Sequence, residues 1–510
     1  MTTLVSSTDT LTRDALAVLQ PGFLGTTAPA WLLRRIGEGL TSVGLFGRNI
    51  SSPEQLAALT AQLRGARDDV LVAIDEEGGD VTRLEVRHGS SFPGNHALGA
   101  VDDTDLTRAV ARELGRRLAE CGVNLNWAPS ADVNSNRDNP VIGVRSFGAD
   151  PGLVARHTAA YVEGLQSAGV AACTKHFPGH GDTAVDSHHA MPRIDVDLDT
   201  VHARDLLPFQ EAIASGSKCV MSAHILLPAL DPNRPATLSP QILTGLLREE
   251  LGFEGLIVTD GMEMQAIAAT YGIERGSVLA IAAGADAICV GGGLADEDTV
   301  LRLRDALVAA VRNGDLPEER LADAAARVRG LADWTRRARG ASEPGADSQE
   351  GTAPGTPIGL VAARRALRMT GTAKPLDTAP FVAALTPVAN IAVGDETPWG
   401  VAAELERLLP GTETVSYSGA GVAGTDTDAL VARVLAAAGE RTVVAVVRDV
   451  HRHLWMAEAL DALLAVRPET VVVEMGLNEA EPRGALHIAT YGAARVCGQA
   501  AAEVIAGREG

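Results

Sequence analysis

One pattern repeats between residue 20 and about residue 295: a short apolar run followed by an amphipathic stretch of helical period. The apolar runs do not alternate with polar residues, which is typical of parallel strands buried on both faces. The eight runs are Gly22–Leu24, Val43–Phe46, Val70–Ile74, Val123–Trp127, Val170–Thr174, Cys219–Ser222, Leu256–Thr259 and Ala287–Val290. Eight such repeats predict an α/β protein whose main domain is a (β/α)₈ TIM barrel.

A change of composition marks a domain boundary after the barrel. Residues 341–357 are rich in Gly, Pro, Ala and Ser, so we expect a linker there, between a catalytic barrel at 1–340 and a C-terminal domain at 358–510. Strand-like runs then alternate with Ala-rich helices, at Asn390–Val393, Val415–Tyr417, Val443–Val447 and Val471–Val473. This order predicts an α/β sandwich with a mostly parallel sheet between helices.

Charge and cysteine usage restrict the setting in which the chain works. The formal net charge is −21, which argues against nucleic acid or an anionic membrane as a partner. The five cysteines form no Cys-x-x-Cys pair, which indicates a reducing compartment. The first residues lack a basic segment followed by an apolar one, and no apolar run approaches about 18 residues. We therefore expect a cytoplasmic protein without a membrane span, whose oligomeric state the sequence does not reveal.

The segment from Lys175 to His189 holds four His, one Lys and two Asp. Pro178, Gly179 and Gly181 interrupt both helix and strand, so an irregular loop is predicted directly after the fifth apolar run. The carboxyl ends of barrel strands are where barrel enzymes carry their active sites. We expect this loop to carry chemistry, together with the polar residues that end other runs, such as Asp75, Glu76, Asn126, His224 and Asp260.

Asp260 ends the seventh apolar run and is followed by a glycine. A carboxylate at the end of a buried strand can reach a sugar carbon and stabilise or trap an oxocarbenium-like centre. The alternative is a helix N-cap, which is common after a strand. Glu263 is a rival carboxylate, but it falls in the first helical turn, where acidic residues often only interact with the helix dipole.

In the loop, Asp186 precedes His188 by two residues. The carboxylate can fix the tautomer of the imidazole and raise its basicity, giving a general acid/base pair, although a surface pair without function remains open. His176, His180, Asp182 and His188 are also possible metal ligands, but their spacings lack the helical pairing of known zinc motifs. We therefore predict no metal.

A Gly-x-Gly-x-x-Gly pattern at residues 419–424 permits a dinucleotide site in the C-terminal domain. Thr425–Thr427 resembles the helix cap, so the glycines precede the helix instead of opening it, and a surface turn is favoured with no cofactor. In the barrel, Asp75, Arg83 and Arg145 offer charge-assisted hydrogen bonds to sugar hydroxyls or an acyl carbonyl. Salt bridges within the domain are the alternative role for the two arginines.

These residues resemble glycoside hydrolase family 3, in particular its two-domain β-N-acetylhexosaminidases, over roughly residues 20 to 335. The segments that carry the resemblance are IDEEGGDVTRL, NLNWAPSADVNSN, NPVIGVRSFG, KHFPGHGDTAVDSHH, MSAHI, RPATLSP and GFEGLIVTDGMEMQAI, in this order. The resemblance implies a TIM barrel followed by an α/β sandwich domain.

The resemblance also implies roles. Asp260 would be the nucleophile, and Asp186 with His188 the acid/base dyad. Asp75, Arg83, Arg145, Lys175 and His176 would hold N-acetylglucosamine in the first subsite. Two departures concern substrate fit: Glu76 stands where these enzymes usually carry Gln, and Gly261-Met262 follows the nucleophile in place of more usual pairs.

The sequence thus predicts a retaining exo-β-N-acetylglucosaminidase that forms a glycosyl-aspartate and needs no metal or other cofactor. Its expected partner is a small glycoside, from recycled cell-wall fragments (peptidoglycan recycling) or from chitin oligomers. A phosphorylase that uses inorganic phosphate as acceptor stays open, because an imidazole repels phosphate less than a second carboxylate does. A non-catalytic sugar-binding protein and a β-glucosidase are also compatible with the sequence, although the intact Asp260, Asp186 and His188 and the loop after Lys175 disfavour them.

Overall fold

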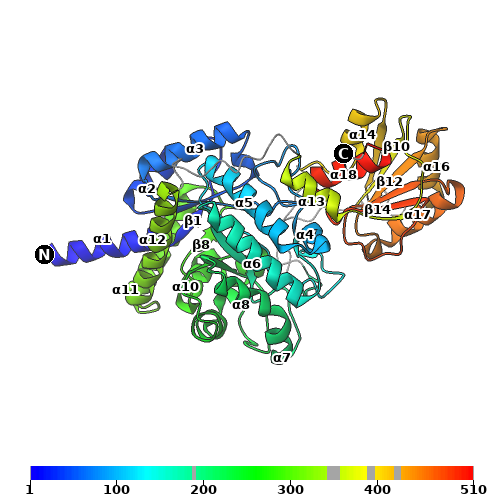
Figure 1. Ribbon diagram of the computed structural model, residues 1–510. Coiled ribbons are helices and arrows are strands. Elements are labelled where there is room, and N and C mark those ends of the chain that lie inside the picture. The colour runs from blue at the N-terminus through cyan, green and yellow to red at the C-terminus, as the bar shows by residue number, and fades with distance from the viewer. Residues whose placement is uncertain (1, 186–190, 342–355, 388–396, 419–426, 509–510) are drawn as a thin grey trace. The chain divides into compact units, whose positions relative to one another are not determined.

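The computed structural model describes residues 2–185, 191–341, 356–387, 397–418 and 427–508 (Figure 1). The chain packs as two compact units. The barrel unit comprises Met1–Glu77, Thr107–Ile142 and Ala149–Ala353, and the sandwich unit comprises Gly78–Leu106, Gly143–Gly148 and Pro354–Gly510. Most of the predicted linker, residues 342–355, lies outside the described residues.

The barrel unit confirms the predicted fold class. Its parallel strands are β1 (Leu19–Pro21), β2 (Ser42–Leu45), β3 (Leu71–Ile74), β4 (Leu125–Asn126), β5 (Ala171–Phe177), β6 (Cys219–Ser222), β7 (Leu256–Thr259) and β8 (Ile288–Val290). β2 to β7 pair in chain order and β8 pairs with β1. A parallel bridge from Val258 to Ala287 connects β7 to the entrance of β8. Every strand residue is buried, which explains why the apolar runs are continuous.

Helices follow the strands around the barrel. They are α1 (Thr2–Ala17), α2 (Ala30–Glu38), α3 (Pro53–Ala66), α5 (Thr104–Glu120), α6 (Pro151–Ser167), α7 (Leu198–Thr200), α8 (Leu207–Ala214), α9 (Gln265–Tyr271), α10 (Ile273–Ala283), α11 (Glu297–Asn313) and α12 (Glu318–Ala341), with shorter or irregular helical segments at Gly47–Asn49, Val201–Asp205, Ala236–Leu238 and Gln241–Glu250. Val328 and Leu331 of α12 pack into the same buried cluster as the strand residues Ala73 and Cys173.

Two predicted strands need correction. The first strand ends at Pro21, so the run Gly22–Leu24 follows β1 instead of forming it. Gln20 and Pro21 interrupt the apolar pattern, whereas their backbone pairs with β8 and the N–H of Gly22 still donates to the Val290 carbonyl at 2.7 Å. β5 continues beyond its predicted end at Thr174 and ends at Phe177.

The sandwich unit contains a six-stranded sheet in the order β11-β10-β12-β13-β14-β9. Its strands are β9 (Arg368–Gly371), β10 (Phe381–Thr386), β11 (Glu413–Ser418), β12 (Val443–Val447), β13 (Val471–Glu474) and β14 (Leu486–Ala489). Only β9, at one edge, is antiparallel among these strands. The mostly parallel sheet is confirmed, with three of the four expected strands within β11, β12 and β13; the fourth, Asn390–Val393, lies outside the described residues.

Helices cover both faces of this sheet, as expected for a sandwich (Figure 1). They are α13 (Ile358–Ala366), α14 (Ala402–Leu408), α16 (Thr427–Ala438), α17 (Leu454–Val466) and α18 (Arg495–Ile505), with a helical turn at Val450–Arg452. The unit also includes α4 (Asn95–Val101) and a helical turn at Gly143–Arg145. Val444 and Val446 of β12 pack with α13, α14 and α18, whereas Val443, Ala445 and Val447 pack with α16 and α17. This alternation follows from the pleat of a strand.

Residues 78–106 lie between two barrel segments in the sequence, but they pack with the sandwich unit. Asp80 is buried, forms an ion pair with Arg448, and accepts the backbone N–H of Ala493 at 2.8 Å. The Arg495 guanidinium donates to Ser91 Oγ at 2.8 Å. Within the described residues, no helix combines the length and apolar character that crossing a membrane requires.

Candidate active site

The end of β5 brings a lysine to two carboxylates from the end of β3. Lys175 Nζ lies 2.5 Å from Asp75 Oδ1 and 2.6 Å from Glu77 Oε1. The side chains of Lys175 and Glu77 are 3% and 2% exposed, whereas that of Asp75 is 20% exposed. The buried ammonium is therefore neutralised by a buried carboxylate, and the more accessible Asp75 can also meet a ligand.

The strand is irregular where these residues lie. Thr174 pairs with Val220 and Phe177 with Ser222, so β5 has one residue more than β6 over this stretch. Such a bulge re-aims side chains and is common beside active sites. The sequence prediction of a loop from Lys175 onward was wrong for Lys175–Phe177, because the strand accommodates the extra residue and ends only before Pro178.

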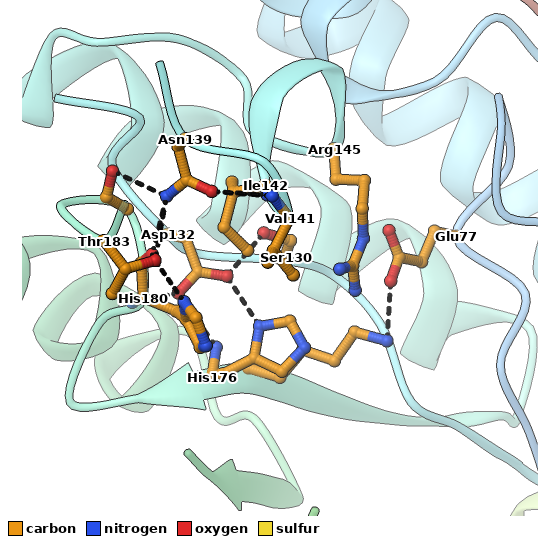
Figure 2. Close-up of polar contacts among 12 residues, drawn as sticks. Glu77, Ser130, Asp132, Asn139, Val141, Ile142, Arg145, His176, His180 and Thr183 are labelled. Carbon is orange, nitrogen blue, oxygen red and sulfur yellow. Dashed lines mark hydrogen bonds and ion pairs between the residues drawn. The ribbon is translucent and has the colours of Figure 1, made fainter. Parts of the chain in front are cut away.

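A third carboxylate, Asp132, forms hydrogen bonds with residues near the end of β5 (Figure 2). Asp132 Oδ2 lies 2.7 Å from His176 Nδ1, and Oδ1 accepts the backbone N–H of His180 at 2.7 Å. Ser130 Oγ donates to Oδ2 at 2.9 Å. Burial alone would raise the pKa of Asp132, but the adjacent His176 and its hydrogen bond hold that pKa well below its usual range.

His180, in the loop after β5, is buried. Its Nδ1 is 3.0 Å from Thr183 Oγ1, and Asn139 Nδ2 donates to the His180 carbonyl at 2.9 Å (Figure 2). Burial lowers the pKa of His180 to about 4, helped by His176 and opposed by the carboxylates of Asp132 and Asp260. The imidazole of His180 is therefore neutral at neutral pH, and its contacts with Thr183 and Asn139 give it a structural role.

Asp260 follows β7 directly, as predicted, and is partly exposed. Its backbone N–H donates to the Ser222 carbonyl at 3.2 Å, and Oδ1 accepts the N–H of Gly261 at 2.8 Å. Below these strand ends, burial raises the pKa of the Cys289 thiol well above its usual value, and the charges of Glu263, Asp260 and Asp75 add to it.

Glu263, the rival carboxylate, has a different task in the structure. Its Oε1 accepts the backbone N–H of Gly291 at 2.8 Å and also that of Gly292. These bonds fix the loop after β8. The carboxylate of Glu263 is therefore engaged in holding backbone, which leaves Asp260 as the better candidate nucleophile.

The remaining predicted residues are distributed as follows. Asp186 and His188 lie outside the described residues. Arg83 and Arg145 belong to the sandwich unit, whereas Asp75, Lys175, His176 and Asp260 belong to the barrel unit. The barrel unit thus brings Asp75 to Lys175 directly, and it places Asp260 directly after β7.

The side chains considered as metal ligands have neighbours of their own. His176 Nδ1 bonds to Asp132, His180 Nδ1 bonds to Thr183, and Asp182 forms an ion pair with Arg204 at 3.0 Å. In the part of the chain that the structure describes, no group of three or more His, Cys, Asp or Glu side chains is arranged to hold a metal ion.

Glu77 and Asp132 are site residues that the sequence patterns did not reveal. Both lie in segments that carry the family resemblance, IDEEGGDVTRL and NLNWAPSADVNSN, but neither directly ends an apolar run. A signal was available for Asp132: an acidic residue amid small and apolar neighbours is rarely buried without a partner, so a cationic or imidazole partner could have been sought.

A parallel barrel with carboxylates, a lysine and histidines at its strand ends defines a class, that of barrel enzymes with acid/base or nucleophilic chemistry. A family model described as "Glycosyl hydrolase family 3 N terminal domain" matches residues 34–331. The chain belongs to glycosyl hydrolase family 3, which confirms the predicted family.

Curated relatives and solved structures agree with this assignment. Beta-hexosaminidase A of Pseudoalteromonas piscicida is 38% identical over 309 residues, which cover 56% of this chain and 52% of that protein. A beta-hexosaminidase of Stenotrophomonas maltophilia (strain K279a) is 37% identical over 260 residues, which cover 50% of this chain and 76% of that protein. The first match therefore spans about half the length of the relative.

Among solved structures, the glycoside hydrolase family 3 beta-N-acetylglucosaminidase from Paenibacillus sp. str. FPU-7 is similar over both units. It has a TM-score of 0.83 and 33% sequence identity, and the match covers 98% of this chain and 97% of that chain. The beta-N-acetylhexosaminidase from Beutenbergia cavernae DSM 12333 matches 63% of this chain with 30% identity and a TM-score of 0.57.

Proposed function

We propose that the protein is a retaining exo-β-N-acetylglucosaminidase that removes terminal β-linked N-acetylglucosamine. The observation that carries the proposal is the similarity to the Paenibacillus β-N-acetylglucosaminidase over 98% of this chain. The position of Asp260 at the end of β7, in a barrel that also presents Asp75 and Lys175, supports it.

In the proposed mechanism an oxygen of Asp260 bonds to C1 of the sugar as the bond between C1 and the leaving oxygen breaks. His188, oriented by Asp186, gives its proton to that leaving oxygen. The same imidazole then takes a proton from water, whose oxygen displaces Asp260 from C1. Two displacements at one carbon retain the β configuration.

The other polar groups hold the sugar. Asp75, Lys175 and His176 would bind hydroxyls, because charged partners give short and directional hydrogen bonds. Arg83 and Arg145 would add further contacts to the sugar or its acyl carbonyl. The exposed fraction of Asp75 beside the buried Lys175 fits a carboxylate that is neutralised on one side and open to a ligand on the other.

A pair of isosteric variants tests the nucleophile. Asp260→Asn should lower kcat on a chromogenic N-acetylglucosaminide by at least about a thousandfold, or about 4 kcal/mol of barrier. The control is Glu263→Gln, which keeps one oxygen for the backbone of Gly291 and should leave most turnover. If Glu263→Gln loses turnover and Asp260→Asn keeps it, Glu263 is the nucleophile instead. An α-configured first product in proton NMR would refute retention.

The acceptor and the substrate are tested in the same assay. Product analysis in phosphate and in an inert buffer distinguishes hydrolysis from release of a sugar 1-phosphate. We propose recycled cell-wall fragments bearing terminal N-acetylglucosamine as the natural substrate and the cytoplasm as the location. Comparing kcat/KM on muropeptide fragments and on chitin oligomers tests the first part, and fractionation of the producing cells tests the second.

A further inference from the structure

Asp132 is a buried carboxylate with no role in the proposed mechanism. We propose that it is a positioning residue, which holds His176 in a single tautomer and orientation and pins the backbone that leads from β5 to His180. It would act on the sugar only through His176. The effect of Asp132 on turnover rests on the proposed function, whereas its effect on the tautomer of His176 can be measured without it.

The geometry around the carboxylate is specific. The side chain of Asp132 is 0% exposed, and both oxygens are used. Oδ2 receives His176 Nδ1 at 2.7 Å and Ser130 Oγ at 2.9 Å, whereas Oδ1 receives the backbone N–H of His176 at 3.2 Å and of His180 at 2.7 Å. One side chain thus binds both the ring of His176 and two backbone positions four residues apart (Figure 2).

The strand pairing explains why Asp132 reaches these positions. Lys175 donates its N–H to the Pro129 carbonyl at 3.0 Å, and Ala131 donates to the Lys175 carbonyl at 2.6 Å. The segment after β4 therefore runs beside the end of β5 through a parallel bridge between Ser130 and Lys175. Asp132 comes next in that segment and faces the residue that follows Lys175.

A carboxylate only accepts hydrogen bonds, so His176 Nδ1 must carry a hydrogen. In the neutral ring this leaves the lone pair on Nε2, which can accept the hydrogen of a sugar hydroxyl; in the charged ring Nε2 donates instead. Asp132 receives four hydrogen bonds, and the adjacent His176 holds the pKa of this group well below its usual range, so it is a carboxylate at neutral pH. The tautomer is consequently set by the protein and not by the solvent.

Asp132→Asn isolates this effect. The asparagine oxygen can keep both backbone N–H bonds, which places its amide nitrogen toward His176 Nδ1 and Ser130 Oγ. The serine hydroxyl can rotate and accept, but the neutral imidazole must move its hydrogen to Nε2. The variant therefore inverts the tautomer of His176 with little change of volume, which is how an Asp-to-Asn change acts in a catalytic triad.

Turnover is measured in two backgrounds. We expect Asp132→Asn to lower kcat/KM on an N-acetylglucosaminide about 100-fold, and the control Ser130→Ala, which removes a bond to Oδ2 but leaves His176 paired, to stay within about threefold of wild type. In a His176→Ala background, Asp132→Asn should cost no more than about twofold, because its action through the ring is gone. An equal loss in both backgrounds would show a purely structural role and overturn the proposal.

The tautomer is measured directly by NMR of protein with ¹⁵N-labelled histidine, with His176→Ala used to assign the signal. The wild type should show the hydrogen on Nδ1 and Asp132→Asn the hydrogen on Nε2. A wild-type His176 with its hydrogen on Nε2 overturns the proposal even if the variant fails to fold. If wild-type protein cleaves no N-acetylglucosaminide, the proposed function fails while this measurement still decides the role of Asp132.

Discussion

Gly181, in the loop after β5, offers a steric test of how tightly this loop is held. A Cβ built on Gly181 would lie 1.6 Å from the Val133 carbonyl oxygen, whereas real contacts of this type are essentially never below 3.0 Å. Gly181→Ala must therefore displace one of the two backbones by about 1.4 Å. The left-handed region is not involved, so the effect is one of space alone.

The magnitude follows from the bonds that such a displacement breaks. The Gly181 carbonyl accepts Asn139 Nδ2 at 2.9 Å and the N–H of Asn136 at 3.3 Å, and the His180 carbonyl accepts the same Asn139 amide at 2.9 Å. Losing two or three bonds at about 1 kcal/mol each, partly among buried groups, gives a destabilisation of about 3 kcal/mol. A movement of this size at a site's edge also costs about 100-fold in turnover.

The assay compares two alanine variants of the barrel unit. Gly181→Ala should lower the melting temperature by roughly 5 to 10 °C and kcat/KM about 100-fold. Gly330→Ala is the control, because Gly330 is exposed within α12 and its Cβ would meet nothing within 4 Å. This control should gain up to about 1 kcal/mol. Wild-type stability and turnover in Gly181→Ala would refute the close approach between the loop and residue 133.

Two further predictions concern buried charges in the sandwich unit. Arg448→Met leaves the buried Asp80 carboxylate without its cationic partner, so the free energy of unfolding in guanidinium should fall by about 3 to 5 kcal/mol. An unchanged unfolding midpoint would show that this ion pair does not stabilise the fold. Burial raises the pKa of Glu474 from 4.5 to about 7, and the negative charge of Asp449 adds to this shift. The folded protein therefore holds the proton of Glu474 more tightly than the unfolded chain does, and the free energy of unfolding should fall by about 3 kcal/mol as the pH rises from about 4.5 to about 7. Glu474→Gln should remove this slope, and a stability difference from wild type that stays constant between pH 5 and 8 would contradict it.

The barrel was predictable because its strands are buried on both faces, which leaves an uninterrupted apolar run for each. The prediction went wrong where a buried strand residue is polar, as at Gln20, or where a strand carries site residues, as at Lys175 and His176. In the sandwich unit, β9 was missed because all four of its residues are exposed at an edge and carry no apolar pattern. The apolar β10 and the mixed β14 were missed as well.

The sequence could locate candidate site residues where a polar residue directly ends an apolar run, as Asp260 and Asp75 do. Glu77 and Asp132 were missed because their importance depends on partners 98 and 44 positions away, Lys175 and His176. A pattern along the chain does not contain those pairings. Physical reasoning could have narrowed the search, since a lysine in an apolar strand requires buried carboxylates to neutralise it.

The sandwich unit is assembled from segments that are far apart in the sequence, and a pattern along the chain does not show which segments pack together. A Cβ on Gly359, in α13, would lie 1.9 Å from the Ser91 carbonyl oxygen, so residues nearly 270 positions apart meet backbone to backbone within this unit. The chain leaves the barrel unit after Glu77, which neutralises Lys175, and three residues later Asp80 is fixed by Arg448. Two buried ion pairs three residues apart in the sequence thus fix this part of the chain, that of Glu77 within the barrel unit and that of Asp80 within the sandwich unit. The residue pattern of IDEEGGDVTRL does not reveal that the chain passes from one unit to the other between them.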